Sequence, residues 1–269
     1  MLRALVLLAA LLTTACSTVP ITGRSQVILF SDADMVKLAD EQHVKFMTDA
    51  KQKGAVVTGS DAAAARDVEL VTRVGRRIIE AAGLADAHQW EITLLRDPTA
   101  NASVLPNGKI VVHTGLLPVT RTEAGLAAVL GHEVGHVVAR HTAERLSHTM
   151  LAQTGVQAAN AAVAVYDPRY QAITAAAFGL GAQVGVLLPY NRAQESEADH
   201  LGLYYMAKAG YDPAEAITLW ERMEAAGGSR QPQWLATHPS PATRRDQIRA
   251  WLPDAQRYYK DRSLPLPTR

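Results

Sequence analysis

The chain of 269 residues suits one large domain or two small ones, and 48% of it is hydrophobic, so it has a substantial core and wholesale disorder is excluded. The 27 Lys and Arg residues nearly balance the 26 Asp and Glu residues, and no local basic patch stands out, so we expect no nucleic-acid partner. Cys16 is the single cysteine, which excludes a disulfide framework and a thiolate metal cluster.

Residues 1–15 have the pattern of a bacterial signal peptide. A basic start is followed by the apolar run 4–12 and by small residues before Cys16, and the run is too short to span a bilayer. Cys16 lies where a lipoprotein signal places its lipid-modified residue, although Thr13 stands where Leu is usual. Because Ser17 rather than Asp follows, we expect a periplasmic protein anchored to the inner leaflet of the outer membrane of a Gram-negative bacterium. The alternative is an ordinary cleaved signal with an incidental cysteine.

The next segments carry two helix patterns. Residues 19–31 form a short, partly extended leader, and Ser31 is a suitable N-cap for a helix over 32–53. A loop at 54–60 separates this helix from an amphipathic helix at 62–82.

Three short strands are predicted next, at 90–95, 101–105 and 109–113. The turn sequence PNG at 106–108 separates the last two, so that pair is expected to form a hairpin. The rest of the pattern is helical. One expected helix begins at 122–123, and further helices are expected at 143–160, 169–187, 192–209, 213–226 and 241–252. Early strands with helices before and after them indicate an α+β fold, and since no repeat or linker divides the chain, we expect residues 16–269 to form a single domain.

Residues 171–188 carry no charged side chain and are long enough to span a membrane. Ala and Gly dominate this segment, however, so we expect a small-residue helix packed inside the protein. The alternative is a lip that contacts the membrane or an apolar substrate.

The run VLGHEVGHVV at 129–138 places three titratable side chains in an otherwise apolar segment. His132 and His136 are four residues apart, about 400° on a helix, so both imidazoles project from one face and can bind one metal ion. Glu133 lies about 100° round the axis, where it can reach a water on that metal without being a ligand. This is the His-Glu-x-x-His pattern of two zinc ligands and a general base.

A catalytic zinc ion usually has three protein ligands and one open position, so a third ligand is needed. One arrangement would take it from a histidine at position 142, but the chain has Thr142 there, and Ala139 where that arrangement has glycine. His141 lies on a different face from His136 and is expected to be either solvated or placed behind a ligand.

Glu195 is the other candidate for the third ligand. Glu195 and Asp199 are four residues apart and share a helical face, so Glu195 can ligate the metal while Asp199 bonds a ligand histidine from behind and fixes its tautomer. Glu197 points about 200° away from Glu195 and is expected to be a solvated acid.

HEVGH at 132–136, ESEAD at 195–199 and THP at 237–239 together resemble the motifs of the zinc metallopeptidases grouped with HtpX and the CAAX prenyl proteases, which are of gluzincin type. The similarity extends from about Thr22 to Arg244, and within the group the chain is most similar to the soluble periplasmic lipoprotein branch that includes BepA and LoiP. The resemblance implies a mainly helical, zincin-like metalloprotease domain with a small early sheet and one Zn²⁺ per chain.

The resemblance also implies roles for residues outside the metal motifs. His238 matches a family histidine that either steadies the oxyanion of the tetrahedral intermediate or occupies the open zinc position in a resting state; a simply exposed histidine is the alternative. Arg244 matches a family arginine expected to contact substrate, with a salt bridge on the helix surface as the alternative. Asn101, Ala102 and Ser103 resemble the edge strand on which an extended peptide lies, although a bulkier residue is common in place of Ser103.

These patterns predict a zinc-dependent endopeptidase in which His132, His136 and Glu195 hold the metal and Glu133 is the general base. The resemblance suggests misfolded or assembly-stalled envelope proteins as substrates, and the outer-membrane assembly machinery as a partner. The alternatives are a chaperone-like binding module whose zinc is structural, and a purely structural helical protein without zinc.

Overall fold

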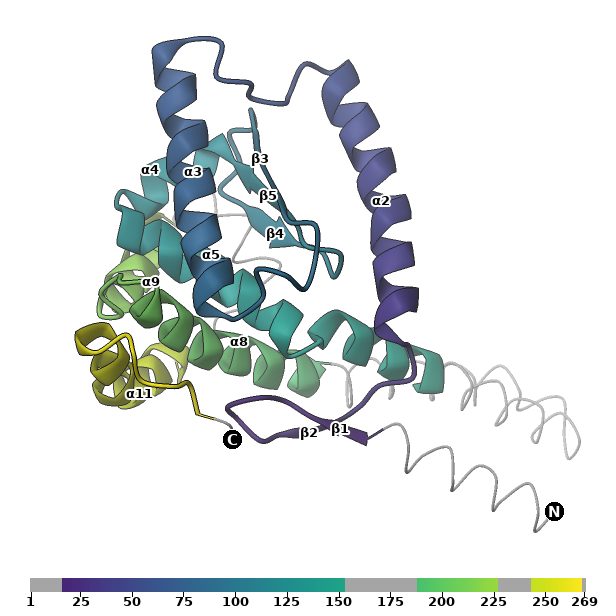
Figure 1. The fold of residues 1–269 in the computed structure, drawn as a ribbon, viewed down its shortest axis with the longest axis vertical. Helices are drawn as coiled ribbons and strands as arrows, with labels where there is room; N and C mark the ends of the chain where they lie inside the picture. Colours follow the sequence, from purple (N-terminus) through teal and green to yellow (C-terminus); the bar gives the residue numbers. More distant parts are fainter. Residues whose placement is uncertain (1–15, 153–187, 227–242, 268–269) are drawn as a thin grey trace, which may run out of the picture.

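The computed structural model describes residues 16–152, 188–226 and 243–267, in which helices surround a small sheet (Figure 1). The strands are β1 (Cys16–Thr18), β2 (Ser25–Val27), β3 (Glu91–Leu95), β4 (Ala102–Val104) and β5 (Lys109–His113). The helices are α2 (Asp32–Gln52), α3 (Ala62–Ala81), the 3₁₀ turn η1 (Thr114–Leu116), α4 (Leu117–Thr120), α5 (Glu123–Val138), α8 (Leu188–Lys208), α9 (Glu215–Ala226) and α11 (Thr243–Lys260). Residues 141–152 are helical as well. The expected α+β fold is confirmed.

Three strands form the central sheet, in the order β3-β5-β4. β5 pairs parallel with β3 and antiparallel with β4, and the turn between β4 and β5 is the predicted hairpin. Gly108 has a φ of 81° there, a conformation that glycine adopts readily. In the described part of the chain β4 pairs with β5 alone, so β4 is an edge strand, as expected for the segment that begins at Asn101.

The side chains of β5 alternate between two cores. Ile110 and Val112 belong to the main hydrophobic core, which includes most of α5, whereas Val111 packs with Ala50 of α2 on the other face of the sheet. Successive side chains of a strand point to opposite faces. Because both faces of β5 are covered, its sequence is an almost continuous apolar run.

The leader predicted at 19–31 is partly extended, as expected, but the sequence did not reveal that its extended part pairs with a strand at 16–18. β1 and β2 pair antiparallel, with Cys16 opposite Val27, and residues 19–24 form the turn between them. Val19 donates to the carbonyl of Arg24, and Gly23 takes a positive φ of 68°. Strands of three residues are too short for a period of two to stand out, so the sequence indicated a partly extended segment but not this hairpin.

The last helix is longer than predicted. The sequence pattern predicted its end at residue 252, but α11 continues through Pro253 to Lys260. Proline removes one backbone donor and strains the preceding turn. Ala255 and Tyr258 are buried beyond it, and this packing keeps the helix intact.

The other helix starts agree with the sequence to within a few residues. Ser31 caps α2 and forms a capping box with Asp34, and Thr122 caps α5 as predicted. The predicted signal peptide, the helix at 169–187, nearly all of the apolar segment 171–188 and the end of the helix at 143–160 lie outside the described residues. Among the described helices, none has the length and apolar character needed to cross a membrane.

Three glycines allow α5 and α8 to approach each other closely. A Cβ on Gly131 would lie 2.9 Å from the carbonyl oxygen of Gly202, and a Cβ on Gly202 would lie 2.8 Å from the backbone nitrogen of His132. One turn further along, a Cβ on Gly135 would lie 2.9 Å from the carbonyl oxygen of Ala198. No side chain fits at these distances. The close approach of the two backbones brings the polar residues of α5 and α8 together.

Candidate metal centre

Two helices supply the predicted metal ligands. α5 carries His132 and His136, and α8 carries Glu195. The Nε2 atom of His132 lies 3.3 Å from Oε2 of Glu195, and Nε2 of His136 lies 3.5 Å from Oε1 of the same carboxylate. The two Nε2 atoms are 3.0 Å apart, and one ligand atom from each of the three residues lies within 4.8 Å of the others. The exposed fractions of these residues are 2%, 6% and 1%.

The chemistry of this cluster fits a metal ion. Two imidazole nitrogens and a carboxylate are a common ligand set for catalytic zinc, and three such groups are costly to bury together without a cation. Burial lowers the pKa of His132, but hydrogen bonds to Asp199 and Glu195 outweigh it and raise the pKa to about 9. The site therefore attracts positive charge, and a metal ion would take the place of the proton.

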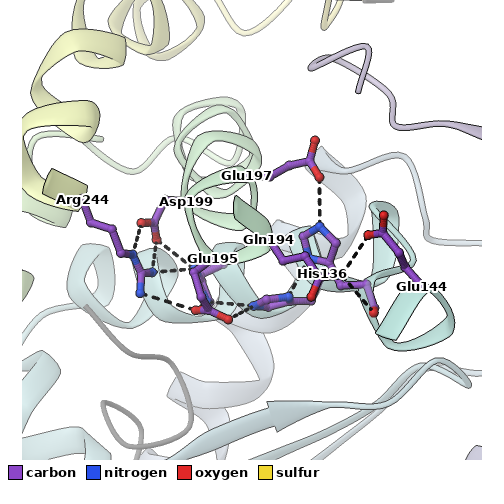
Figure 2. Close-up of polar contacts among 9 residues, drawn as sticks. His136, Glu144, Gln194, Glu195, Glu197, Asp199 and Arg244 are labelled. Atoms are coloured by element: carbon purple, nitrogen blue, oxygen red, sulfur yellow. Dashed lines mark hydrogen bonds and ion pairs between the residues drawn. The ribbon is translucent and has the colours of Figure 1, made fainter. Parts of the chain in front are cut away.

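Asp199 and Arg244 support His132, and Figure 2 shows the guanidinium of Arg244 against the carboxylate of Asp199. Asp199 Oδ1 accepts a hydrogen bond from Nδ1 of His132 at 2.8 Å, as the spacing on α8 predicted. Arg244 donates from Nε to Oδ2 of Asp199 at 2.6 Å and from Nη2 to Oδ1 at 2.7 Å. Burial alone would raise the pKa of Asp199, but Arg244 and His132 lower it.

Arg244 is not on the surface of α11. Its exposed fraction is 1%, its guanidinium lies 4.3 Å from the ring centre of Trp220, and Nη1 lies 3.4 Å from Oε2 of Glu195. The alternative of a helix-surface salt bridge is therefore wrong. The position matched by resemblance lies beside the predicted metal ligands, and its contact with substrate stays a prediction.

The His136 side of the cluster contains residues that sequence reasoning placed in solvent or did not single out. His141 is fully buried, and its Nδ1 lies 2.7 Å from Nδ1 of His136. Its Nε2 lies 3.0 Å from Oε2 of Glu197, whose exposed fraction is 6%. The expectation of a solvated Glu197 is wrong, and so is the solvated alternative for His141; contact with His136 from behind is confirmed.

An arginine from the N-terminal turn explains the burial of Glu197. Arg24 Nε donates to Oε2 of Glu197 at 2.8 Å, and its two terminal nitrogens donate to both oxygens of Glu144 at 2.7 and 2.8 Å. Thr22 Oγ1 also donates to Glu197, and Gln194 donates to Glu144 at 2.8 Å. Burial would raise the pKa of Glu197, but the hydrogen bonds from His141, Arg24 and Thr22 lower it to about 2.

The predicted base lies on α5, and the predicted substrate-binding residues lie at the edge strand β4. Glu133 is buried on α5 between the two histidines, and its role as base stays a prediction. On the edge strand Ala102 points into the core and Ser103 outward. Oδ1 of Asn101 is buried and accepts no hydrogen bond from the described residues. Cys16 begins β1, and His238 lies outside the described residues.

A mainly apolar cavity of about 590 Å³ lies beside the cluster. Its lining includes His136 and Val137 of α5, Val104 of the edge strand, and Met35 of α2. The cavity therefore lies between the free edge of the sheet and one predicted ligand.

Comparisons with known proteins agree with this chemistry. The model of the family described as Peptidase family M48 matches residues 65–252. The mitochondrial metalloendopeptidase OMA1 of Schizosaccharomyces pombe is 43% identical over 195 residues, which cover 69% of this chain and 53% of the relative. The human mitochondrial metalloendopeptidase OMA1 is 28% identical over 243 residues, 88% of this chain and 46% of the relative. The beta-barrel assembly-enhancing protease of Escherichia coli is 29% identical over 183 residues, 65% of this chain and 37% of the relative. The chain thus spans about half the length, or less, of these curated relatives.

Proposed function

Since the chain belongs to peptidase family M48, we propose that it is a zinc-dependent endopeptidase whose metal is held by His132, His136 and Glu195. The observation that carries the proposal is the meeting of these three buried donors from α5 and α8, with Glu133 beside them on α5. A zinc ion held there would supply Lewis-acid chemistry for the peptide carbonyl and for the attacking water.

The residues of the chain perform the proton transfers and the positioning. Glu133 accepts the proton of the attacking water and donates it to the leaving amine, so no covalent enzyme intermediate is needed. Asp199 holds His132 through Nδ1, with Arg244 balancing the charge of the carboxylate. His238, in the role implied by resemblance, either donates to the oxyanion or blocks the site in a resting state.

The proposed substrate is an extended polypeptide that pairs with the outer edge of β4. Asn101, Ala102 and Ser103 would contact its backbone, and the apolar cavity beside Val104 and His136 would accept one of its side chains. Support for this part comes from the edge position of the strand and from the apolar lining of the cavity.

Glu133→Gln tests the enzymatic proposal. The variant keeps the size of the side chain and removes the base, so we expect zinc content to persist while cleavage of an unfolded protein falls at least about a hundredfold. Zinc is measured by elemental analysis and cleavage by gel electrophoresis. Glu221→Gln, an exposed position on α9, is the matched control and should cleave normally.

Two outcomes would contradict the proposal. Cleavage that persists in the Glu133→Gln variant would exclude the assigned base. A zinc-loaded unmutated protein that cleaves no unfolded substrate would favour the chaperone-like module with a structural metal.

We further propose that the protein acts in the bacterial cell envelope, on misfolded or assembly-stalled proteins, and that a lipid on Cys16 anchors it to the outer membrane. The signal-like sequence before Cys16 supports this location, and one relative is named for enhancing beta-barrel assembly. Other relatives are named mitochondrial, so the location rests on the N-terminal sequence of this chain.

Mass spectrometry of the mature N-terminus tests the anchor. We expect an acylated Cys16 in protein from membrane fractions, and a Cys16→Ser variant that is absent from the outer membrane. An unmodified Cys16, or a mature N-terminus at another residue, would contradict the lipoprotein assignment and leave the metal chemistry unaffected.

A further inference from the structure

The two predicted histidine ligands are supported from behind by different groups. A carboxylate, Asp199, lies directly on Nδ1 of His132 at 2.8 Å. A second histidine takes the corresponding place at His136: Nδ1 of His141 lies 2.7 Å from Nδ1 of His136. Two ring nitrogens at this distance need one proton between them, and the structure identifies which ring carries it.

Glu197 decides the proton position. It receives donors from Arg24 and Thr22 and lies 3.0 Å from Nε2 of His141. Figure 2 shows Glu197 and Glu144 on the opposite side of the cluster from Arg244 and Asp199. A carboxylate that faces an arginine is ionised and can only accept, so Nε2 of His141 must carry a proton.

The rest of the proton arrangement follows from this contact. A neutral His141 with its proton on Nε2 has a lone pair on Nδ1, and that lone pair accepts the Nδ1 proton of His136. The lone pair of His136 Nε2 is then directed at Glu195 and His132, where the metal would lie.

We propose that Arg24 and Glu197 are positioning residues of the metal centre: acting through His141, they fix the proton of His136 on Nδ1 and direct its Nε2 at the ion. The inference deepens the proposed function and rests on it, since it takes His136 as a zinc ligand. The inference also gives a role to the N-terminal hairpin, which carries Arg24. This hairpin lies outside residues 65–252, the part of the chain that matches the family model.

Arg24 is suited to this role by its surroundings. The Nε side of its guanidinium binds Glu197, and the two terminal nitrogens bind both oxygens of Glu144. The side chain is therefore held in one orientation. Glu144 is itself buried and accepts from Gln194. The hairpin that carries Arg24 is thereby tied to the residues that follow α5 and to α8.

Glu197→Gln is the central test. The amide keeps the shape of the side chain but is a weaker acceptor and no longer pairs with Arg24 as an ion, so we expect zinc affinity to fall about tenfold or more. Affinity is measured by competition with a chromophoric chelator, without any protease assay. Glu215→Gln is the matched control, because Glu215 also accepts from an arginine and a threonine, Arg222 and Thr122, away from the cluster. Zinc affinity of the control should match that of the unmutated protein.

The tautomers give a second, independent measurement. In ¹⁵N-histidine NMR spectra of the zinc-loaded, unmutated protein, we expect His141 to carry its proton on Nε2 and His136 to carry its proton on Nδ1. A merely structural role of Glu197 makes no such demand. A His141 protonated on Nδ1 alone would overturn the proposal, as would unchanged zinc affinity in Glu197→Gln.

A double-mutant cycle keeps the test decisive if one variant folds poorly. Arg24→Lys retains the charge and should keep part of the zinc affinity that Arg24→Met loses. Combining Arg24→Met with Glu197→Gln should weaken zinc binding little more than the stronger single change, because both act through His141. Fully additive losses would show that the two residues do not act in series.

The failures can be told apart. A chain that binds no zinc at all overturns both the proposed function and this inference. A chain that binds zinc equally well with Glu197→Gln overturns the inference alone, and a chain that loses zinc affinity as expected but never cleaves a protein overturns the protease assignment alone.

Discussion

Arg244 shows how a single buried cation makes the acidic side of the cluster possible. Asp199 and Glu195 lie one turn apart on α8, both buried, and repel each other as carboxylates. Arg244 reaches both, with two hydrogen bonds of 2.6 and 2.7 Å to Asp199 and a longer contact of 3.4 Å to Glu195. Its net effect on stability depends less on the ion pairs themselves than on what their removal leaves behind.

Replacing Arg244 with Met tests this reading. Two carboxylates would remain buried near each other without their cation, so we expect the free energy of unfolding to fall by about 3–5 kcal/mol. The measurement is urea unfolding of the metal-free protein. Arg249→Met is the control on the same helix; Arg249 is half-exposed, and its surface pairs should contribute less than about 1 kcal/mol. If Arg244→Met lowers the free energy of unfolding by less than about 1 kcal/mol, Arg244 is not needed to balance the buried carboxylates of Asp199 and Glu195.

Spacing along one helix predicted the contacts of Asp199 and left those of Glu197 unresolved. A separation of four residues puts Glu195 and Asp199 on one face, and this depends on α8 alone. Glu197 does point away from Glu195, but that side of α8 faces the N-terminal hairpin and not solvent. Its partner Arg24 is 173 residues away in the chain, a contact that only tertiary structure specifies.

At the scale of elements, the crossing of α5 and α8 sets the geometry of the cluster. The three glycines at the crossing let the two backbones meet, so that a short carboxylate on α8 reaches two imidazoles on α5. Larger residues there would separate the helices by several tenths of an ångström or more, which matters for ligands whose positions must agree closely.

Gly202→Ala is the corresponding prediction. Alanine gains about 1 kcal/mol of helix propensity over glycine, but its Cβ would lie 2.8 Å from the backbone nitrogen of His132. We expect a net loss of about 1–3 kcal/mol in the free energy of unfolding, together with weaker zinc binding. Arg192→Ala, an exposed position on α8, should change stability by less than about 0.5 kcal/mol. A Gly202→Ala variant that is more stable than the unmutated protein would show that the crossing tolerates a side chain.

Element starts and types were predictable where a local signal exists. Ser31, Thr122 and the PNG turn each fix a start or a turn through their own backbone contacts. The signal fails where packing overrides it: the predicted end of the last helix at residue 252 is too early, because the buried side chains of Ala255 and Tyr258 hold α11 together beyond Pro253. The β1–β2 hairpin could not be predicted because no local signal exists: its strands are too short to carry a pattern.

At the scale of the whole molecule, the cluster joins parts of the chain that have no sequence proximity. α5 and α8 provide the predicted ligands, α11 provides Arg244, and the N-terminal turn provides Arg24. A metal bound by α5 and α8 would therefore stabilise the arrangement of all four segments. Because an ion that binds the folded chain and not the unfolded one shifts the equilibrium toward folding, stability reports on the site without a protease assay.

Removal of zinc is thus expected to lower the melting temperature. At a free zinc concentration about 100 times the dissociation constant, binding adds about 2.7 kcal/mol to stability. For a chain of this size that corresponds to a rise of about 5–10 °C, measured by calorimetry with buffered zinc and with a chelator. His136→Ala loses one of the three proposed ligands and should show little dependence on zinc, which separates binding at this cluster from binding elsewhere on the protein. An equal rise in the unmutated protein and in His136→Ala would place the ion at another site, and no rise in either would contradict a zinc centre at the crossing of α5 and α8.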